Sequence, residues 1–142
     1  MKPADPYDLQ RFVDAQRTVY PRVDLELQSG RKTNHWMWFI FPQIAGLGHS
    51  PMAKKYAISS LGEARAYLDH PLLGQRLRHC SRLVTCVQGK SVEDIFGYPD
   101  YLKFQSSMTL FARATTDNQV FLSALEKYFR SEFDQATLER LG

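Results

Sequence analysis

The chain has 142 residues, of which 44% are hydrophobic and 23% charged, and its formal net charge is +3 at pH 7. This length and composition fit one globular domain with its own core, and they exclude disordered and fibrous proteins. The 18 basic and 15 acidic residues are spread evenly along the chain, without the basic tail or block that marks many nucleic-acid-binding proteins. We therefore expect a single globular domain over residues 1–142.

The sequence shows no signal for a membrane or for secretion. No apolar run approaches the roughly 18 residues that a membrane-spanning helix needs, and the first six residues lack the apolar core of a signal peptide. Cys80 and Cys86 are six positions apart on one expected helix, about 9 Å along its axis, which is too far for a disulfide. We expect a cytoplasmic protein whose two thiols are free and at least partly buried.

The pattern of the first part of the chain predicts helices on either side of an aromatic run. Apolar residues at helical spacing predict a helix over residues 9–20. Pro21 then either kinks this helix or starts a second one that ends near Gly30. The run over residues 36–41 is too short and too uniformly apolar to distinguish a helix from a buried strand. Residues 46–51 are rich in glycine and predict a loop.

The second part carries clearer helix signals. Ser60 and Glu63 have capping-box spacing and predict a helix that ends before Pro71. The strongest pattern lies over residues 73–87, where one apolar stripe is formed by Leu73, Leu77, Cys80, Val84 and Val87. A short turn over residues 91–97 and a helix over residues 99–114 follow.

Two last helices are expected, with Asn118 and Asp134 as their N-caps. Together these elements predict an all-α, multihelical single domain with buried central helices around an aromatic core. The alternative is a small strand pair beside the aromatic run.

The aromatic run is also the first candidate for a binding site. Trp36 and Trp38 cannot both occupy one narrow helix face, so one ring is expected to approach the surface or a cavity, where it would stack on a planar ligand. His35 would transfer protons near neutral pH, and Gln43 follows the run. The alternative is that both rings belong wholly to the core and that His35 is paired locally.

Lys103, Ser106 and Ser107 form the second candidate group, because residues three and four apart share one face of a helix. A lysine beside a hydroxyl lowers the barrier to its proton transfer or binds an anion jointly with it. Alternatively, the serines only allow close helix packing. The candidate catalytic residues are thus His35, Lys103 and Ser107, and the candidate ligand-binding residues are Trp36, Trp38, Gln43, Lys103 and Ser106.

Other chemistry has less support. Arg76, Arg78 and Arg82 give one helix a basic side that a phosphate-rich partner would use, but a solvated helix face explains it as well, and we do not expect nucleic-acid binding. No group of ligand residues has the spacing of a metal site, so neither a metal nor another cofactor is expected.

The segment 36–43, followed by Gly46-Leu47-Gly48, resembles the opening signature of domain-of-unknown-function family 1810, whose bacterial members are sometimes labelled calpastatin. The similarity extends over residues 9–141 and includes the segments 56–58, 63–65, 67–68, 70–71, 73–77, 96–97 and 106–111. It implies a multihelical fold with buried central helices and no established activity. This sequence departs from the family pattern at Pro21, where alanine or leucine is more usual, which puts the continuity of the first helix in question. It also has Tyr101 where a second acid is common after Asp100, which weakens any scheme with paired carboxylates.

The calpastatin label implies a protease inhibitor. Inhibitors of that type are disordered chains that fold on their target, whereas this sequence has a dense aromatic core. We therefore set the label aside.

Two functional hypotheses remain. In the first, a small nucleotide-like or phosphorylated metabolite binds between the segment 35–43 and the helix over residues 99–114, with His35 as the base if hydrolysis or group transfer occurs. In the second, the protein is a non-catalytic interaction or structural module, for instance a homodimer. The sequence leaves open whether the protein is an enzyme.

Overall fold

In the computed structural model, the described residues, 4–142, form ten helices and no strand longer than an isolated bridge. The helices are α1 (Gln10–Gln16), α2 (Tyr20–Gln28), α3 (Met37–Ile40), α4 (Pro51–Lys55), α5 (Leu61–Asp69), α6 (Leu73–Cys86), α7 (Val92–Phe96), α8 (Asp100–Ala114), α9 (Gln119–Phe129) and α10 (Gln135–Leu141). The all-α prediction is confirmed. Residues 1–3, which belong to the expected domain and to the segment inspected for a signal peptide, lie outside the described residues.

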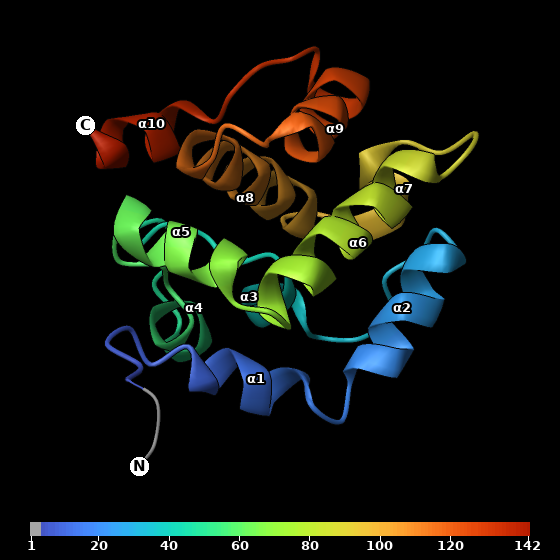
Figure 1. The fold of residues 1–142 in the computed structure, drawn as a ribbon. Coiled ribbons are helices and arrows are strands. Elements are labelled where there is room, and N and C mark those ends of the chain that lie inside the picture. Colours follow the sequence, from blue (N-terminus) through green and yellow to red (C-terminus); the bar gives the residue numbers. More distant parts are fainter. Residues whose placement is uncertain (1–3) are drawn as a thin grey trace.

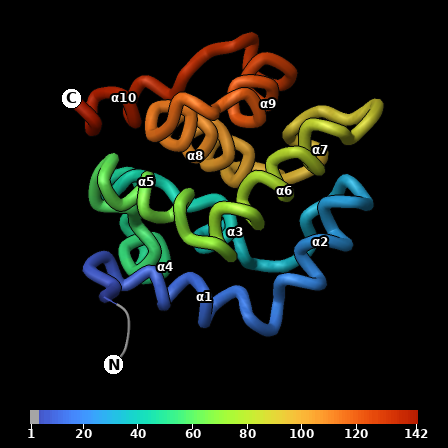
Figure 2. The backbone as a smooth tube through the Cα atoms, in the orientation of Figure 1, coloured from blue at the N-terminus to red at the C-terminus, as the bar shows by residue number. Residues whose placement is uncertain are grey.

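Helix α8 is the central element. It contacts α5, α7, α9 and α10, and Figure 1 shows α9 and α10 on one side of it and α5 on the other. Helix α1 runs along the lower edge of the view, α2 lies at its right side, and α3 lies near its centre (Figure 2). No helix in the described part of the chain has both the length and the apolar composition to cross a membrane.

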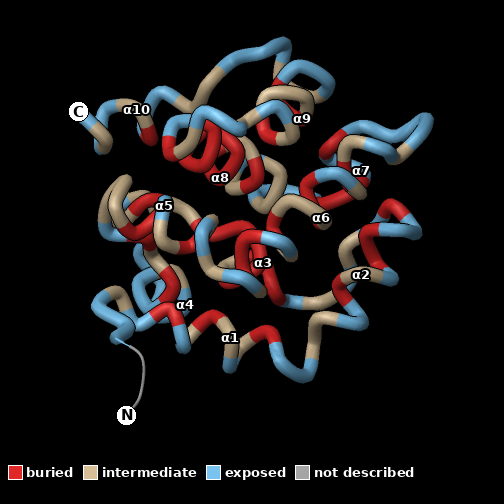
Figure 3. The backbone as a smooth tube through the Cα atoms, viewed as in Figure 1, coloured by how far each residue is buried: buried red, intermediate tan, exposed pale blue. Residues whose placement is uncertain are grey.

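The burial pattern follows this arrangement. Residues 106–112 of α8 are buried without interruption, and Figure 3 shows buried segments concentrated on α3 and α8. A helix that is buried on all sides needs to satisfy its polar side chains internally. Ser106 and Thr109 do so in part by donating to the carbonyls of Leu102 (3.2 Å) and Gln105 (2.8 Å).

Aromatic rings connect the helices through the core. Phe104 of α8 lies 4.9 Å from Phe96 of α7 and 5.0 Å from Phe41, measured between ring centroids. At the other side of the core, Phe12 of α1 meets Tyr67 of α5 edge to face at 5.1 Å. Such pairs each contribute about 0.5–1.5 kcal/mol beyond the burial of their area, so the aromatic run does belong to the structural centre.

The two open questions about the first half of the chain have definite answers. Pro21 lies in the first turn of α2 and therefore starts a new helix instead of kinking the first. The aromatic run forms one helical turn, α3. The expected alternative of a strand pair corresponds only to an isolated parallel bridge between Ile44 and Ile58, with Ala45 N–H donating to the Ile58 carbonyl at 2.8 Å.

The caps agree with the predictions in part. Ser60 accepts from the Glu63 N–H, but the Glu63 carboxylate accepts from Ser59 instead of completing a capping box. Ser91 and Asp94 form a complete capping box at the start of α7, which occupies the expected short turn.

The N-caps of the last two helices and the burial of the two cysteines were also predicted. Asp134 caps α10 as expected. Asn118 also stands at the N-cap position of α9, but its side chain makes no capping hydrogen bond and donates instead to the Ala112 carbonyl at 2.9 Å. Both cysteines are free, but Cys86 is exposed and only Cys80 is buried, since Cys86 ends α6 on the side away from its apolar stripe.

Candidate functional site

The two tryptophans differ in burial, although Lys32, which pairs with Asp100, also lies 5.3 Å from the centroid of the Trp36 ring. Trp36 is buried, and its indole N–H donates to Glu26 Oε1 at 3.0 Å. Trp38 is half-buried and follows on α3, where the buried positions are Met37, Phe39 and Ile40. The single turn of α3 thus turns one ring inward and leaves the other at the surface.

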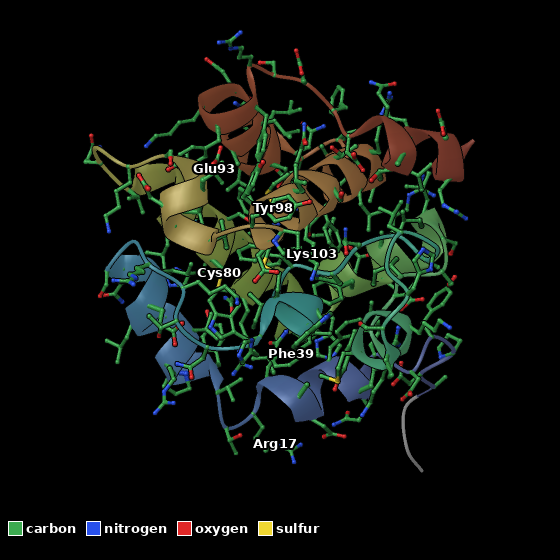
Figure 4. The ribbon with its side chains drawn as sticks, turned by 180° about the vertical axis from the view of Figure 1, so that it is seen from behind. Arg17, Phe39, Cys80, Glu93, Tyr98 and Lys103 are labelled. Atoms are coloured by element: carbon green, nitrogen blue, oxygen red, sulfur yellow. The ribbon has the colours of Figure 1, made fainter. Side chains whose placement is uncertain are left out.

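Trp38 meets the side chain of Lys103, which comes from the first turns of α8. The Lys103 ammonium lies 5.7 Å from the centroid of the Trp38 ring, within the range of a cation–π contact. It also lies 3.3 Å from Asp100 Oδ1, while Lys32 lies 2.8 Å from Asp100 Oδ2. Two lysines therefore share one carboxylate and leave one positive charge in excess. Figure 4 shows Lys103 in the middle of this side of the molecule, next to α3.

Gln43 and Trp38 line the same small hollow, together with Gly46 and Gly48. The free space in this hollow is about 10 Å³, close to what one water molecule needs. The Gln43 side chain makes no hydrogen bond within the described residues, so its amide is available to a ligand at the surface.

Gly46 brings the C-terminal helix close to this hollow. Its φ of +98° is a conformation that glycine adopts without strain. A Cβ at this position would lie 2.3 Å from Nη1 of Arg140. The loop of residues 46–49 and α10 are therefore in contact because this position has no side chain.

The serines lie apart from the Lys103 ammonium. Ser106 Oγ lies 2.9 Å from Oδ2 of Asp134, the residue that caps α10. Ser107 is fully buried, and its hydroxyl has no hydrogen-bond partner among the described residues. No hydrogen bond in residues 4–142 joins Lys103 to either serine, so the joint lysine–serine chemistry has no support in this arrangement.

His35 is exposed and makes no hydrogen bond or ion pair within the described residues. Of the candidate residues, Trp38 thus contacts Lys103 and shares a hollow with Gln43. Trp36 faces Glu26, Ser106 faces α10, and His35 and Ser107 do not join them. We call the surface formed by Lys32, Trp38, Gln43, Asp100 and Lys103 the Trp38 face.

The expected basic side of α6 is divided in the structure. The Arg76 guanidinium lies 4.2 Å from the centroid of the Tyr20 ring and donates to Gln16 Oε1 at 3.2 Å. Arg78 instead donates to the Asp117 carbonyl at 2.8 Å. The three arginines therefore do not form one stripe toward solvent.

The geometry can now be set beside known proteins. The family model described as a protein of unknown function (DUF1810) matches residues 6–141. The chain belongs to this family. The chain is also similar to a solved structure, the conserved hypothetical protein Rv1873 from Mycobacterium tuberculosis, with 59% identity, a TM-score of 0.96, and coverage of 96% of this chain and 98% of that one. No curated protein matches the chain.

In this DUF1810 protein, the sequence analysis did not identify Asp100 as a residue of the Trp38 face. The spacing of Asp100 and Lys103, three residues apart on a helix, is a readable signal for an ion pair. The contact of Lys32 with the same carboxylate has no such signal, because it joins segments far apart in the sequence. The close approach of Arg140 to Gly46 likewise could not be predicted from the local sequence pattern.

Glu26 holds the segment that links Lys32, a residue of the Trp38 face, to Trp36 in this DUF1810 domain. Its carboxylate accepts hydrogen bonds from Thr33 N–H (2.6 Å), Asn34 N–H (3.0 Å), the Asn34 side chain (2.7 Å) and the Trp36 indole. Burial raises the pKa of Glu26, but these donors outweigh it and hold the pKa below its ordinary value of 4.5. The segment between Lys32 and Trp36 is thereby fixed by one ionised carboxylate.

Proposed function

We propose that this protein binds a small, planar, anionic ligand of the nucleotide-like or phosphorylated-metabolite kind on the Trp38 face. The observation that supports the proposal is the contact between the Lys103 ammonium and the Trp38 ring at 5.7 Å. An aromatic ring offers a stacking surface, and a neighbouring ammonium offers a charge for a phosphate or carboxylate. The free amide of Gln43 adds a hydrogen-bonding group at the edge.

The charge balance of the face favours an anion. Asp100 neutralises one of the two lysines, and Lys32 is the better covered of the two, with 7% of its side chain exposed against 27% for Lys103. Lys103 is therefore the cation that solvent and ligands reach. An anion would replace part of the contact that Lys103 makes with Asp100.

The shape of the face sets the mode of binding. The hollow beside Trp38 has about 10 Å³ of free space, far below the roughly 300 Å³ of an ordinary ligand pocket. The ligand would lie across the surface instead of being enclosed. Because the candidate catalytic groups do not meet there, the proposal is one of binding and includes no turnover.

Tryptophan fluorescence tests this proposal. Titration with adenosine monophosphate should change the emission of the half-buried Trp38 in a saturable way, and Trp38→Phe should remove that change because Trp36 is buried. Lys103→Ala should weaken the affinity about 10- to 100-fold, the equivalent of one charge-assisted hydrogen bond. Arg22→Ala, which removes an exposed positive charge on α2, is the matched control and should leave binding unchanged.

Two results would contradict the proposal. One is the absence of a saturable change in the wild type with adenosine monophosphate and with ribose 5-phosphate. The other is an equal affinity in the Lys103→Ala and Arg22→Ala variants.

A homodimer is the second candidate, and a specific observation favours it. Tyr98, before α8, is 80% exposed, and Leu102 in its first turn is 42% exposed. Exposed aromatic and large aliphatic side chains are enriched at many interfaces between proteins. Tyr98 lies above Lys103 in the view of Figure 4.

Sedimentation at increasing protein concentration separates the two candidates. A dimer through this patch should dissociate in the double variant Tyr98→Ser, Leu102→Ser, while binding of the nucleotide should not depend on these residues. A monomer at all concentrations would remove the dimer from consideration.

A further inference from the structure

A groove between α6 and α9 lies outside the Trp38 face and has room for a ligand. The two helices pack against each other, and the groove between them has a volume of about 420 Å³, within the range of about 300–1,000 Å³ for small-molecule sites. We call it the α6–α9 groove. Its lining includes Arg78, Arg82, Thr85, Cys86, Val120 and Ser123.

The charge in this groove is not balanced. Arg78 is held by the Asp117 carbonyl at 2.8 Å, and the Asp117 carboxylate stays 3.8 Å away with a side chain that is 88% exposed. Arg82 is exposed and has no ion pair or hydrogen bond to any described residue. The lining thus contains two arginines against one acidic side chain, Asp117, and the first turn of α9 adds no further acid.

Arg78 is already positioned for recognition. Its guanidinium lies 5.3 Å from the centroid of the Phe121 ring, and the hydrogen bond to Asp117 uses only its Nη1. An arginine has five N–H donors in a planar fork that matches a phosphate. Arg82 follows four residues later on α6, so the two guanidinium groups lie on neighbouring positions of one helix face.

The rest of the lining has mixed character. Val120 and the Cys86 thiol provide apolar surface, and the hydroxyl groups of Thr85 and Ser123 provide hydrogen-bonding capacity. Gln119 holds Ser123 in place by donating to its oxygen at 3.0 Å. A ligand with one anionic end and one apolar end would fit this combination.

We infer that the α6–α9 groove is a binding site for a small organic phosphate, with the phosphate between Arg78 and Arg82 and its apolar part against Val120 and Cys86. This site is separate from the Trp38 face and does not depend on the function proposed there. It involves no covalent step.

The exposed thiol makes the site testable in the unmodified protein. The chain has two cysteines, and Cys80 is buried and therefore an internal unreactive reference, while Cys86 lies in the groove. Burial also raises the pKa of the Cys80 thiol to about 12, so alkylation by iodoacetamide should occur at Cys86 alone. Intact-mass measurements with and without phenyl phosphate then report occupancy of the groove.

The expected result is protection. Phenyl phosphate at about ten times its dissociation constant should slow alkylation of Cys86 roughly tenfold, since about a tenth of the protein stays free. Benzyl alcohol, which lacks the phosphate, should protect much less. In Arg82→Ala the affinity for phenyl phosphate should fall about 10- to 100-fold, and Arg82→Lys should lie between this variant and the wild type.

Each comparison is made within one variant, as the ratio of the two alkylation rates, so a change in the intrinsic thiol reactivity does not affect it. Lys103→Ala and Arg22→Ala should keep full protection, which separates this site from the Trp38 face and from general charge effects. Absence of protection in the wild type at millimolar phenyl phosphate, or undiminished protection in Arg82→Ala, would overturn the inference.

Discussion

Arg11 shows how a single residue fastens separate segments of this chain. Its guanidinium donates to Glu63 Oε2 and to the carbonyls of Lys55 and Ala57, each at 2.8 Å. It also donates to the carbonyls of Tyr7 and Asp8. All five N–H donors of an arginine are thus satisfied, and three segments of the chain meet at one side chain.

We expect Arg11→Ala to lower the free energy of unfolding by about 3–5 kcal/mol, because Glu63 would lose its buried ionic partner. Only 14% of the Arg11 side chain and 4% of the Glu63 side chain are exposed. Arg17→Ala is the matched control, since its ion pair with Asp14 is open to solvent and should contribute less than about 1 kcal/mol. Urea denaturation measures both, and equal losses would contradict this role of Arg11.

Glu26 predicts a dependence of stability on pH. Its folded pKa lies below the ordinary value of 4.5, so its stabilising contribution is present above that value and is lost as the pH falls through the folded pKa. Glu26→Gln should therefore cost about 1–3 kcal/mol at pH 7. The difference from the wild type should shrink in acid below the ordinary pKa, as measured by urea denaturation at both pH values. A difference that stays the same in acid would show that the charge of Glu26 does not matter.

At the scale of the elements, side chains of α9 donate hydrogen bonds to the carbonyls at the C-terminal end of α6. Lys127 donates to the carbonyls of Thr85 and Val87, and the Tyr128 hydroxyl donates to the Val84 carbonyl, each at 2.6 Å. The last carbonyls of a helix have no partner within the helix. The side chains of α9 provide these partners, which fixes the wall of the α6–α9 groove.

Tyr128→Phe should therefore reduce stability by about 1 kcal/mol, the net contribution of one hydrogen bond. Tyr98→Phe is the same chemical change at an exposed position and should stay within about 0.5 kcal/mol of the wild type. The midpoints of urea denaturation compare the two. A loss in Tyr98→Phe as large as that in Tyr128→Phe would contradict the expectation.

The junction of α5 and α6 depends on Gly74. A Cβ at this position would lie 1.9 Å from the Leu68 carbonyl oxygen. Gly74→Ala should destabilise the fold by about 1–3 kcal/mol or more, although alanine favours helix. Gln75→Ala, at the exposed neighbouring position, should change the free energy of unfolding by less than about 0.5 kcal/mol. Thermal unfolding of the two variants checks this, and a neutral Gly74→Ala would show that the close approach is relaxed in solution.

At the scale of the whole molecule, most of the fold was readable from local signals. The apolar stripe over residues 73–87 predicted α6 almost to its ends, because helix periodicity and caps are local properties. Asn118 shows the limit. It stands at the N-cap position of α9, but its side chain donates to the carbonyl of Ala112, six residues earlier, and not to the first turn of α9.

The candidate site was readable only in part. The two nearby rings predicted that one of them would approach the surface or a cavity, without showing which one, and helix spacing singled out Lys103. The sequence could not show that Lys103 would turn to Asp100 and Trp38 instead of to the serines, since that choice depends on how α3 and α8 pack. The α6–α9 groove could not be predicted from the sequence either, because it depends on how α6 and α9 pack.

We propose above that the Trp38 face binds an anionic ligand through Lys103. The most direct test is a thermal-shift comparison of the wild type, Lys103→Ala and Arg22→Ala with a panel of nucleotides, sugar phosphates and acidic metabolites. A ligand at about 100 times its dissociation constant should stabilise the wild type by roughly 2.7 kcal/mol, a shift of about 5–10 °C in Tm. We predict such a shift in the wild type and Arg22→Ala and its loss in Lys103→Ala. No shift with any member of the panel, or a shift that survives in Lys103→Ala, would contradict the claim.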